Sequence, residues 1–229
     1  MNSSSTADFV LDSVSVSHTD TYTYLGTPIS PLPISDQVKK HLSSKSSHVL
    51  KFYSFVTKNS DAPFQVKRTV WESALQSAIF YSSETWLTTD LRVAESTYMA
   101  TLKLLLDVRP TTCNDIALVE AGVGKAKSII TQRQSNFLHK LKSRENFGNT
   151  YLGKVVDLAI ESKFSAGQML QKILDLGPNH DYVSNCLNST KESVRLSNSS
   201  RRVAYNTVYP ELSLNYIWRQ VLTNHPNKH

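Results

Sequence analysis

The sequence predicts a mainly α protein, in which a short N-terminal β element of two or three strands is followed by a helical bundle. Three observations support this fold class. From Phe9 to Ile29, apolar residues alternate with Ser and Thr in the period-two pattern of strands. From Asp36 onward the apolar period lengthens to about 3.6 residues, which is the period of helices. Only 7 glycines occur among 229 residues, and hydrophobic residues make up 40%, which excludes collagen-like and low-complexity chains.

Prolines mark the end of the strand element. Pro28, Pro31 and Pro33 lack the backbone donor that a sheet requires, so we expect the sheet to stop there and a connector to begin. Ser35 or Asp36 can cap the helix that follows.

The first helical stretch is predicted to be one helix or two helices with a Ser-rich bend between them. Its broken apolar stripe consists of Val38, Leu42, Val49, Phe52, Tyr53 and Val56.

Two stronger helices follow. One opens after Pro63, which suits a first helical turn, and runs to Ile79 with Val66, Val70, Ala74, Leu75, Ala78 and Ile79 inside. The next is capped within Thr88 to Asp90 and is ended by Pro110. Its predicted inner residues are Leu91, Ala94, Tyr98, Leu102, Leu105 and Leu106.

The remaining elements are less regular. A capping-box-like sequence at Thr112–Asp115 begins a short helix, and further helices are expected over Thr150–Ser162 and from Ser165. The last fifty residues are expected to contain a turn at Gly177 and an amphipathic helix over Leu212–Leu222.

Known catalytic and metal-binding patterns are missing from the sequence. Gly122-Val123-Gly124-Lys125 lacks the earlier Gly and the following Ser or Thr of a phosphate loop, so it is interpreted as a turn between helices. The 7 histidines show no metalloprotease spacing, the 2 cysteines match no zinc signature, and no nucleophile elbow occurs. We therefore predict no catalytic residue, no metal site and no cofactor.

Charge is distributed unevenly along the chain. The net charge is +6, yet all 25 lysines and arginines follow Gln37, and four aspartates precede it. The stretch from Lys125 to Arg144 carries Lys125, Lys127, Arg133, Lys140, Lys142 and Arg144 without any carboxylate. These cations could bind phosphates, or they could form an ordinary solvated helix face.

No targeting segment is visible in the sequence. The N-terminus lacks the basic and apolar regions of a signal peptide, and no apolar run is long enough for a membrane helix. The expectation is a nuclear or cytoplasmic protein without membrane contact.

Several segments resemble, in chain order, the part of non-LTR retrotransposon reverse transcriptases that follows the catalytic palm. Tyr22-Thr23-Tyr24-Leu25-Gly26-Thr27 is similar to the strand pair that holds the primer end in that family. The resemblance continues through Val49–Lys58, Pro63–Glu72, Ile79–Trp86, Thr111–Glu120 and Tyr205–Leu212.

The resemblance implies a fragment of an RNA-directed DNA polymerase. Residues 1–34 would be the end of the palm with the primer grip, 35–122 a helical thumb-like region, and 123–229 a truncated basic helical linker region. The family's catalytic aspartates, which hold magnesium in the full-length enzyme, lie upstream of the Tyr-Leu-Gly strand, so this chain alone is expected to be inactive.

Site residues carried over by position are of two kinds. Tyr24, Leu25 and Gly26 correspond to the primer grip, with a simple strand end as the alternative. Lys39, Lys40, Lys67 and Arg68 become candidate phosphate contacts, together with the cations of the Lys125 to Arg144 stretch. The expected ligand is RNA or an RNA–DNA hybrid, bound by shape and charge. The alternatives are a helical module that binds the missing palm or another protein, and a remnant without function.

Overall fold

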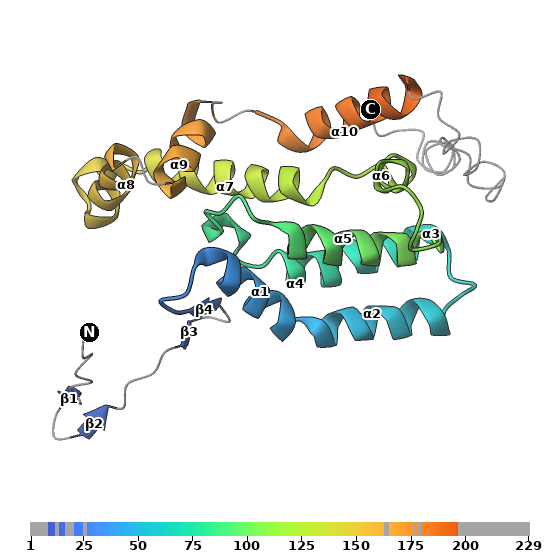
Figure 1. Ribbon diagram of the computed structural model, residues 1–229, viewed down its shortest axis with the longest axis horizontal. Helices are drawn as coiled ribbons and strands as arrows, with labels where there is room; N and C mark the ends of the chain where they lie inside the picture. The colour runs from blue at the N-terminus through green and yellow to red at the C-terminus, as the bar shows by residue number, and fades with distance from the viewer. Residues whose placement is uncertain are drawn as a thin grey trace, which may run out of the picture.

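The computed structural model describes residues 9–11, 14–16, 21–24, 27–162, 165–175, 177 and 180–196, and it confirms a mainly helical fold with a small N-terminal β element (Figure 1). The strands are β1 (Phe9–Leu11), β2 (Val14–Val16), β3 (Tyr22–Tyr24) and β4 (Thr27–Ile29). The helices of the first half are α1 (Ile34–Ser44), α2 (Ser46–Lys58), α3 (Phe64–Val70), the π-helical η1 (Trp71–Gln76), α4 (Ser77–Ile79), the 3₁₀ turn η2 (Ser83–Thr85) and α5 (Arg92–Leu105). Those of the second half are α6 (Asn114–Ala121), α7 (Ala126–Lys142), the 3₁₀ turn η3 (Phe147–Asn149), α8 (Tyr151–Glu161), α9 (Ser165–Asp175) and α10 (Tyr182–Leu196). The helix expected over Leu212–Leu222 and the resembling segment Tyr205–Leu212 lie outside the described residues.

The helices lie in successive rows. In Figure 1, α1 and α2 form one edge, α3 to α5 the middle, α6 and α7 the next row, and α10 the opposite edge, with α8 and α9 at one end. Contacts join α2 to α5, α5 to α6 and α7, and α10 to α6 and α7. The predicted bend between the first two helices is confirmed, because α1 ends at Ser44 and α2 begins at Ser46.

The strands form two antiparallel hairpins, β1 with β2 and β3 with β4. Thr23 pairs with Pro28 in the second hairpin, so β4 continues past the first proline and ends before Pro31. A two-stranded hairpin tolerates this proline because each strand has an outer edge that needs no donor. The β3–β4 hairpin contacts α1.

A main apolar cluster fills the space between the rows. It contains buried residues of α1, α2, η1, α4, α5, α6 and α7, together with Val194 of α10, and partly buried residues of α3 pack against it. Trp71, Phe80 and Tyr98 lie at its centre, with the Tyr98 ring 5.2 Å from Trp71 and 5.6 Å from Phe80. The Trp71 indole donates to Thr101 Oγ1 at 3.1 Å, which satisfies its polar group.

The helix predicted from Pro63 to Ile79 is continuous but contains a π-helical turn. The wider turn aligns Trp71, Leu75 and Ile79, four residues apart, toward the core. Val66 and Ala74, which a regular period places inside, are exposed instead. Sequence periodicity assumes 3.6 residues per turn, so it places Leu75 and Ile79 inside correctly but places Val66 and Ala74 there wrongly.

A smaller apolar cluster lies at the end of the molecule, among α7, η3, α8 and α9. Its buried residues are Leu138, Leu141, Phe147, Val156, Leu170 and Ile173. Two glycines allow the backbones to approach closely. A Cβ on Gly153 would overlap the Phe147 carbonyl, and a Cβ on Gly167 would overlap the Ala159 carbonyl.

Helix α10 was not predicted by the sequence. Its residues are rich in Ser, Asn and Thr, which favour turns when considered locally. The Asp181 carboxylate accepts from the Ser184 amide at 2.8 Å, and the Tyr182 amide donates to Gln132 of α7 at 2.8 Å. Capping and packing on α6 and α7 therefore offset the weak local preference.

Within the described residues, every helix is too short or too polar to span a lipid bilayer.

Candidate nucleic-acid interface

A cleft of about 680 Å³ lies between the β3–β4 hairpin, α1, the η2 segment and α7. Thr27 and Ile29 of the hairpin form one wall, and Phe137 of α7 lies on another. Two hydrogen bonds fix the η2 segment against α7. The Arg133 guanidinium donates to the Phe80 carbonyl at 2.7 Å, and the Gln134 amide donates to the Trp86 carbonyl at 2.8 Å.

Aromatic rings give the cleft its chemical character. Tyr81 is 44% exposed and Phe137 is 42% exposed, so both rings present accessible surface, whereas Trp86 is buried. The Lys45 ammonium lies 5.8 Å from the centre of the Tyr81 ring. Exposed rings next to a cation can stack with planar ligands such as nucleobases.

His41 forms the floor of the cleft between the aromatic residues. Its ring is nearly parallel to Tyr81, at 6.5 Å between centres, and meets Trp86 edge-on at 5.5 Å. Only 1% of the residue is exposed. Burial, and secondly the Lys45 ammonium, lower the pKa of His41 below 6.5, although the carbonyls of Ala78 and Ile79 oppose the shift.

We expect the buried His41 to make the protein less stable as the pH falls below about 6.5. The unfolded chain binds a proton on this imidazole at a higher pH than the folded chain does, so protonation favours unfolding. The wild-type protein should therefore lose more unfolding free energy between pH 7.5 and the acidic range than His41→Gln, which cannot titrate there. Urea denaturation at a series of pH values measures this difference, and identical pH dependence in the two proteins would contradict it.

The candidate cations of the first helices are engaged within the protein. Lys39 pairs with Asp36 at 2.7 Å, and Lys40 donates to Thr21 at 2.8 Å, although both side chains are largely exposed. Lys67 donates to the Ser60 carbonyl.

Arg68 has a structural role in the packing of α3 against α6. Its guanidinium pairs with Glu72 at 2.8 Å and donates to the Ala121 carbonyl at the end of α6 at 3.1 Å. The side chain is 25% exposed. Arg68 thus holds two elements together, and a phosphate would have to compete with these partners.

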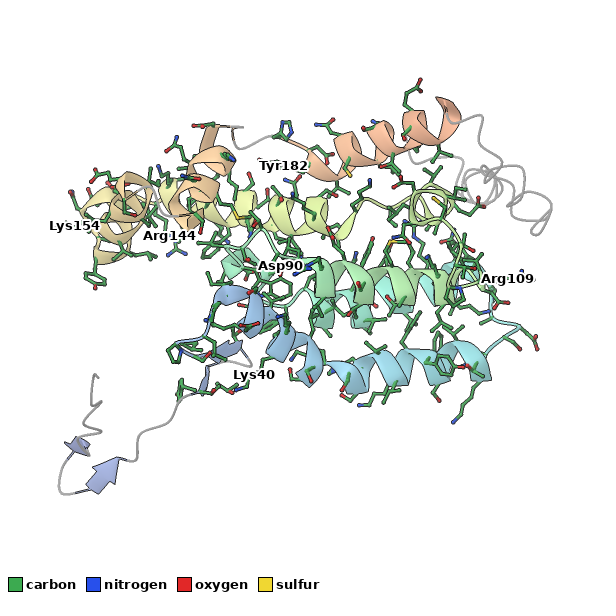
Figure 2. The ribbon with its side chains drawn as sticks, viewed as in Figure 1. Lys40, Asp90, Arg109, Arg144, Lys154 and Tyr182 are labelled. Atoms are coloured by element: carbon green, nitrogen blue, oxygen red, sulfur yellow. The ribbon has the colours of Figure 1, made fainter. Side chains whose placement is uncertain are left out.

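The cations of the Lys125 to Arg144 stretch separate into two groups. Lys125 pairs with Asp115 at 3.0 Å, and Arg133 is held by the Phe80 carbonyl and lies over the Phe80 ring. The other members are exposed, and their side chains have no ion-pair or hydrogen-bond partner among the described residues: Lys127, Lys140, Lys142 and Arg144. Figure 2 shows Arg144 at the same end of the molecule as Lys154.

The primer-grip correspondence can be located only in part. Tyr24 is the last residue of β3, where it pairs with Thr27 across the hairpin. Leu25 and Gly26 lie outside the described residues. The hairpin that contains Tyr24 borders the cleft, because Thr27 and Ile29 line it.

Sequence reasoning missed His41, Tyr81 and Phe137 as members of one site. From the sequence, Tyr residues at helical spacing are interpreted as core, and each histidine as a surface group or as a buried group with its hydrogen bonds satisfied. One feature of the sequence could have identified Phe137 as a site residue. It follows Arg133 by four residues and precedes Lys140 by three, so it lies on the same helix face as both cations. His41 and Tyr81 come close to that face of α7 only through tertiary packing, which the sequence does not show.

Across the described residues, no group of three or more His, Cys, Asp or Glu side chains could hold a metal ion. No protein-family model, curated protein or solved structure shows significant similarity to this chain.

Proposed function

We propose that this chain binds RNA or an RNA–DNA hybrid, as a thumb-like and linker part of a non-LTR retrotransposon reverse transcriptase. The proposal rests on the order of resembling segments in the sequence and on one structural observation. That observation is the face of α7 on which the exposed Phe137 and Lys140 follow Arg133 at helical spacing, beside the aromatic cleft.

The chemistry of this face, and of Arg144 just beyond the end of α7, suits a nucleic-acid backbone. Lys140 and Arg144 have no carboxylate partner among the described residues, so binding a phosphate would break no ion pair there. Each phosphate contact releases condensed counterions, which makes affinity fall as salt rises. Tyr81 and Phe137 can stack with unpaired bases of any identity. The resulting binding would read shape and charge rather than sequence.

We expect Lys140→Gln with Arg144→Gln to weaken binding of an RNA–DNA hybrid and to reduce its salt dependence. If both side chains contact phosphates, the slope of log affinity against log salt should become shallower by about 1.5 to 2. Fluorescence anisotropy with a labelled hybrid over a salt series measures both effects.

The matched control is Lys51→Gln with Lys58→Gln on α2, at the edge of the molecule that α1 and α2 form (Figure 1). These lysines are also exposed, and their removal changes the net charge by the same amount. The proposal requires the α2 variant to keep most of the wild-type slope. If both variants lost the same affinity and salt dependence, the effect would be one of general charge. Salt-independent binding by the wild-type protein would contradict the proposal outright.

A further inference from the structure

Helix α8 presents an apolar stripe to solvent. Tyr151 is 86% exposed, Leu152 48%, Val155 42% and Leu158 63%. Tyr151, Val155 and Leu158 follow one another at intervals of four and three residues, so they lie along one face of the helix. Single exposed apolar residues are ordinary on a protein surface, but a contiguous stripe on one helix indicates a contact surface.

The packing of α8 fixes the direction of this stripe. Gly153 and Val156 are buried, and Gly153 lies directly against the Phe147 carbonyl. Ala159 is in contact range of Gly167 on α9. Because the backbones approach so closely at Gly153 and Gly167, the inner face of α8 has no room for a larger side chain. The helix therefore cannot rotate to bury Tyr151, Val155 and Leu158 against its own cluster.

Charged residues border the stripe on one side only. Lys154 and Glu161 are seven residues apart and share a flank, with Asp157 between them along the chain. All three are exposed, and the described part of the chain supplies no ion-pair partner to any of them. The flank thus carries a positive group near one end of the stripe and negative groups toward the other.

Lys154 and Glu161 are complementary to each other across a two-fold axis, whereas Asp157, which is farther round the helix from the stripe, would lie near its own copy. When two copies of one helix pack antiparallel about a two-fold axis, the same flank of each copy faces that of the other. With the axis between Val155 and Leu158, Lys154 and the partner's Glu161 come within about 3 Å along the helix direction at 1.5 Å per residue. The same contact occurs twice on one side of the interface, and the apolar stripes face each other beside the two ion pairs.

We infer that α8 is a self-association surface, through which two copies of this chain form an antiparallel, two-fold symmetric dimer. One short helix per copy is a small interface compared with the roughly 800 Å² per partner of standard complexes, so we expect the dimer to be weak. The surface lies on α8, whereas Lys140 and Arg144 of the proposed nucleic-acid site lie on α7 and just after it, and the test uses no nucleic acid.

Sedimentation equilibrium of the full chain over a concentration series tests the inference. The wild-type protein should change from monomer to dimer with rising concentration, and Leu158→Glu should raise the dissociation constant at least about tenfold, because two buried carboxylates would face the apolar stripe. Leu50→Glu is the matched control, since Leu50 is 68% exposed on α2 and should leave the dimer unchanged.

A charge exchange identifies the antiparallel geometry. Lys154→Glu and Glu161→Lys should each weaken the dimer because like charges then meet at both ends, whereas the double variant should regain most of the wild-type affinity. A wild-type protein that stays monomeric throughout, as it would if residues of its own chain covered α8, overturns the inference. So does a dimer that Leu50→Glu and Leu158→Glu weaken equally.

Discussion

Replacing Trp71 with alanine should lower the free energy of unfolding by about 3 to 5 kcal/mol, the range for deleting a large buried aromatic side chain. Trp71 is the first residue of the π-helical turn, is 1% exposed, and lies 5.2 Å from the ring of Tyr98 on α5. The substitution removes this contact and the hydrogen bond to Thr101. The surrounding helices cannot collapse into the space without breaking their own contacts, so a cavity would remain.

Chemical denaturation measures this loss, with Leu50→Ala as the control. Leu50 is 68% exposed, so its truncation should change the unfolding free energy by no more than about 0.5 kcal/mol. A loss below about 1 kcal/mol for Trp71→Ala would show that the ring is not packed at the centre of the main cluster.

Replacing Gly167 with valine should destabilise the smaller cluster by about 3 kcal/mol or more, because the new side chain would overlap the backbone of α8. Its Cβ would occupy the place of the Ala159 carbonyl and approach Ile160. A backbone atom inside a hydrogen-bonded helix cannot rotate away as a flexible side chain can. We therefore expect α8 and α9 to separate while the main cluster stays folded.

Amide hydrogen exchange distinguishes this local effect from global unfolding. Protection should fall in α8 and α9 and persist in α5, whose inner residues belong to the main cluster. Gly148→Ala is the control, since a Cβ at Gly148 would meet nothing within 4 Å. Unchanged protection in the Gly167→Val protein would mean that α8 and α9 do not approach each other closely.

Those parts of the fold that depend on local signals were predictable. The apolar period located α5, whose predicted inner residues Ala94, Tyr98 and Leu102 are all buried. The Gly122 turn was likewise predicted, and Gly122 ends α6 with a φ of 66°, which glycine adopts without strain. The predicted cap of α5 within Thr88 to Asp90 was wrong, because the N-cap is Leu91, without a side-chain capping hydrogen bond.

Features that depend on packing were not predictable. Helix α10 has a polar sequence, and its amphipathic spacing becomes meaningful only once α6 and α7 provide a surface for Leu187 and Val194. The π-helical turn changes the helical period and so turns the inner face toward Trp71. No single residue type in the sequence indicates such a turn.

In the candidate site, too, some features follow from local sequence and others from tertiary packing. The charge of the Lys125 to Arg144 stretch is visible in the sequence, but the choice of Arg133 as a structural group and Lys140 as a free one depends on where α7 meets Phe80. The cleft itself joins residues from four separate segments.

Helix α7 belongs to both apolar clusters. Ala126 and Ile130 in its first half lie in the main cluster, and Leu138 and Leu141 in its second half lie in the smaller one. With 17 residues, α7 is about 25 Å long, and it packs in both apolar clusters. The two clusters are therefore thermodynamically linked through one element. A ligand that binds Lys140 and Arg144, at and just after the C-terminal end of α7, would stabilise the smaller cluster against local unfolding. Local unfolding of that cluster would in turn release the ligand.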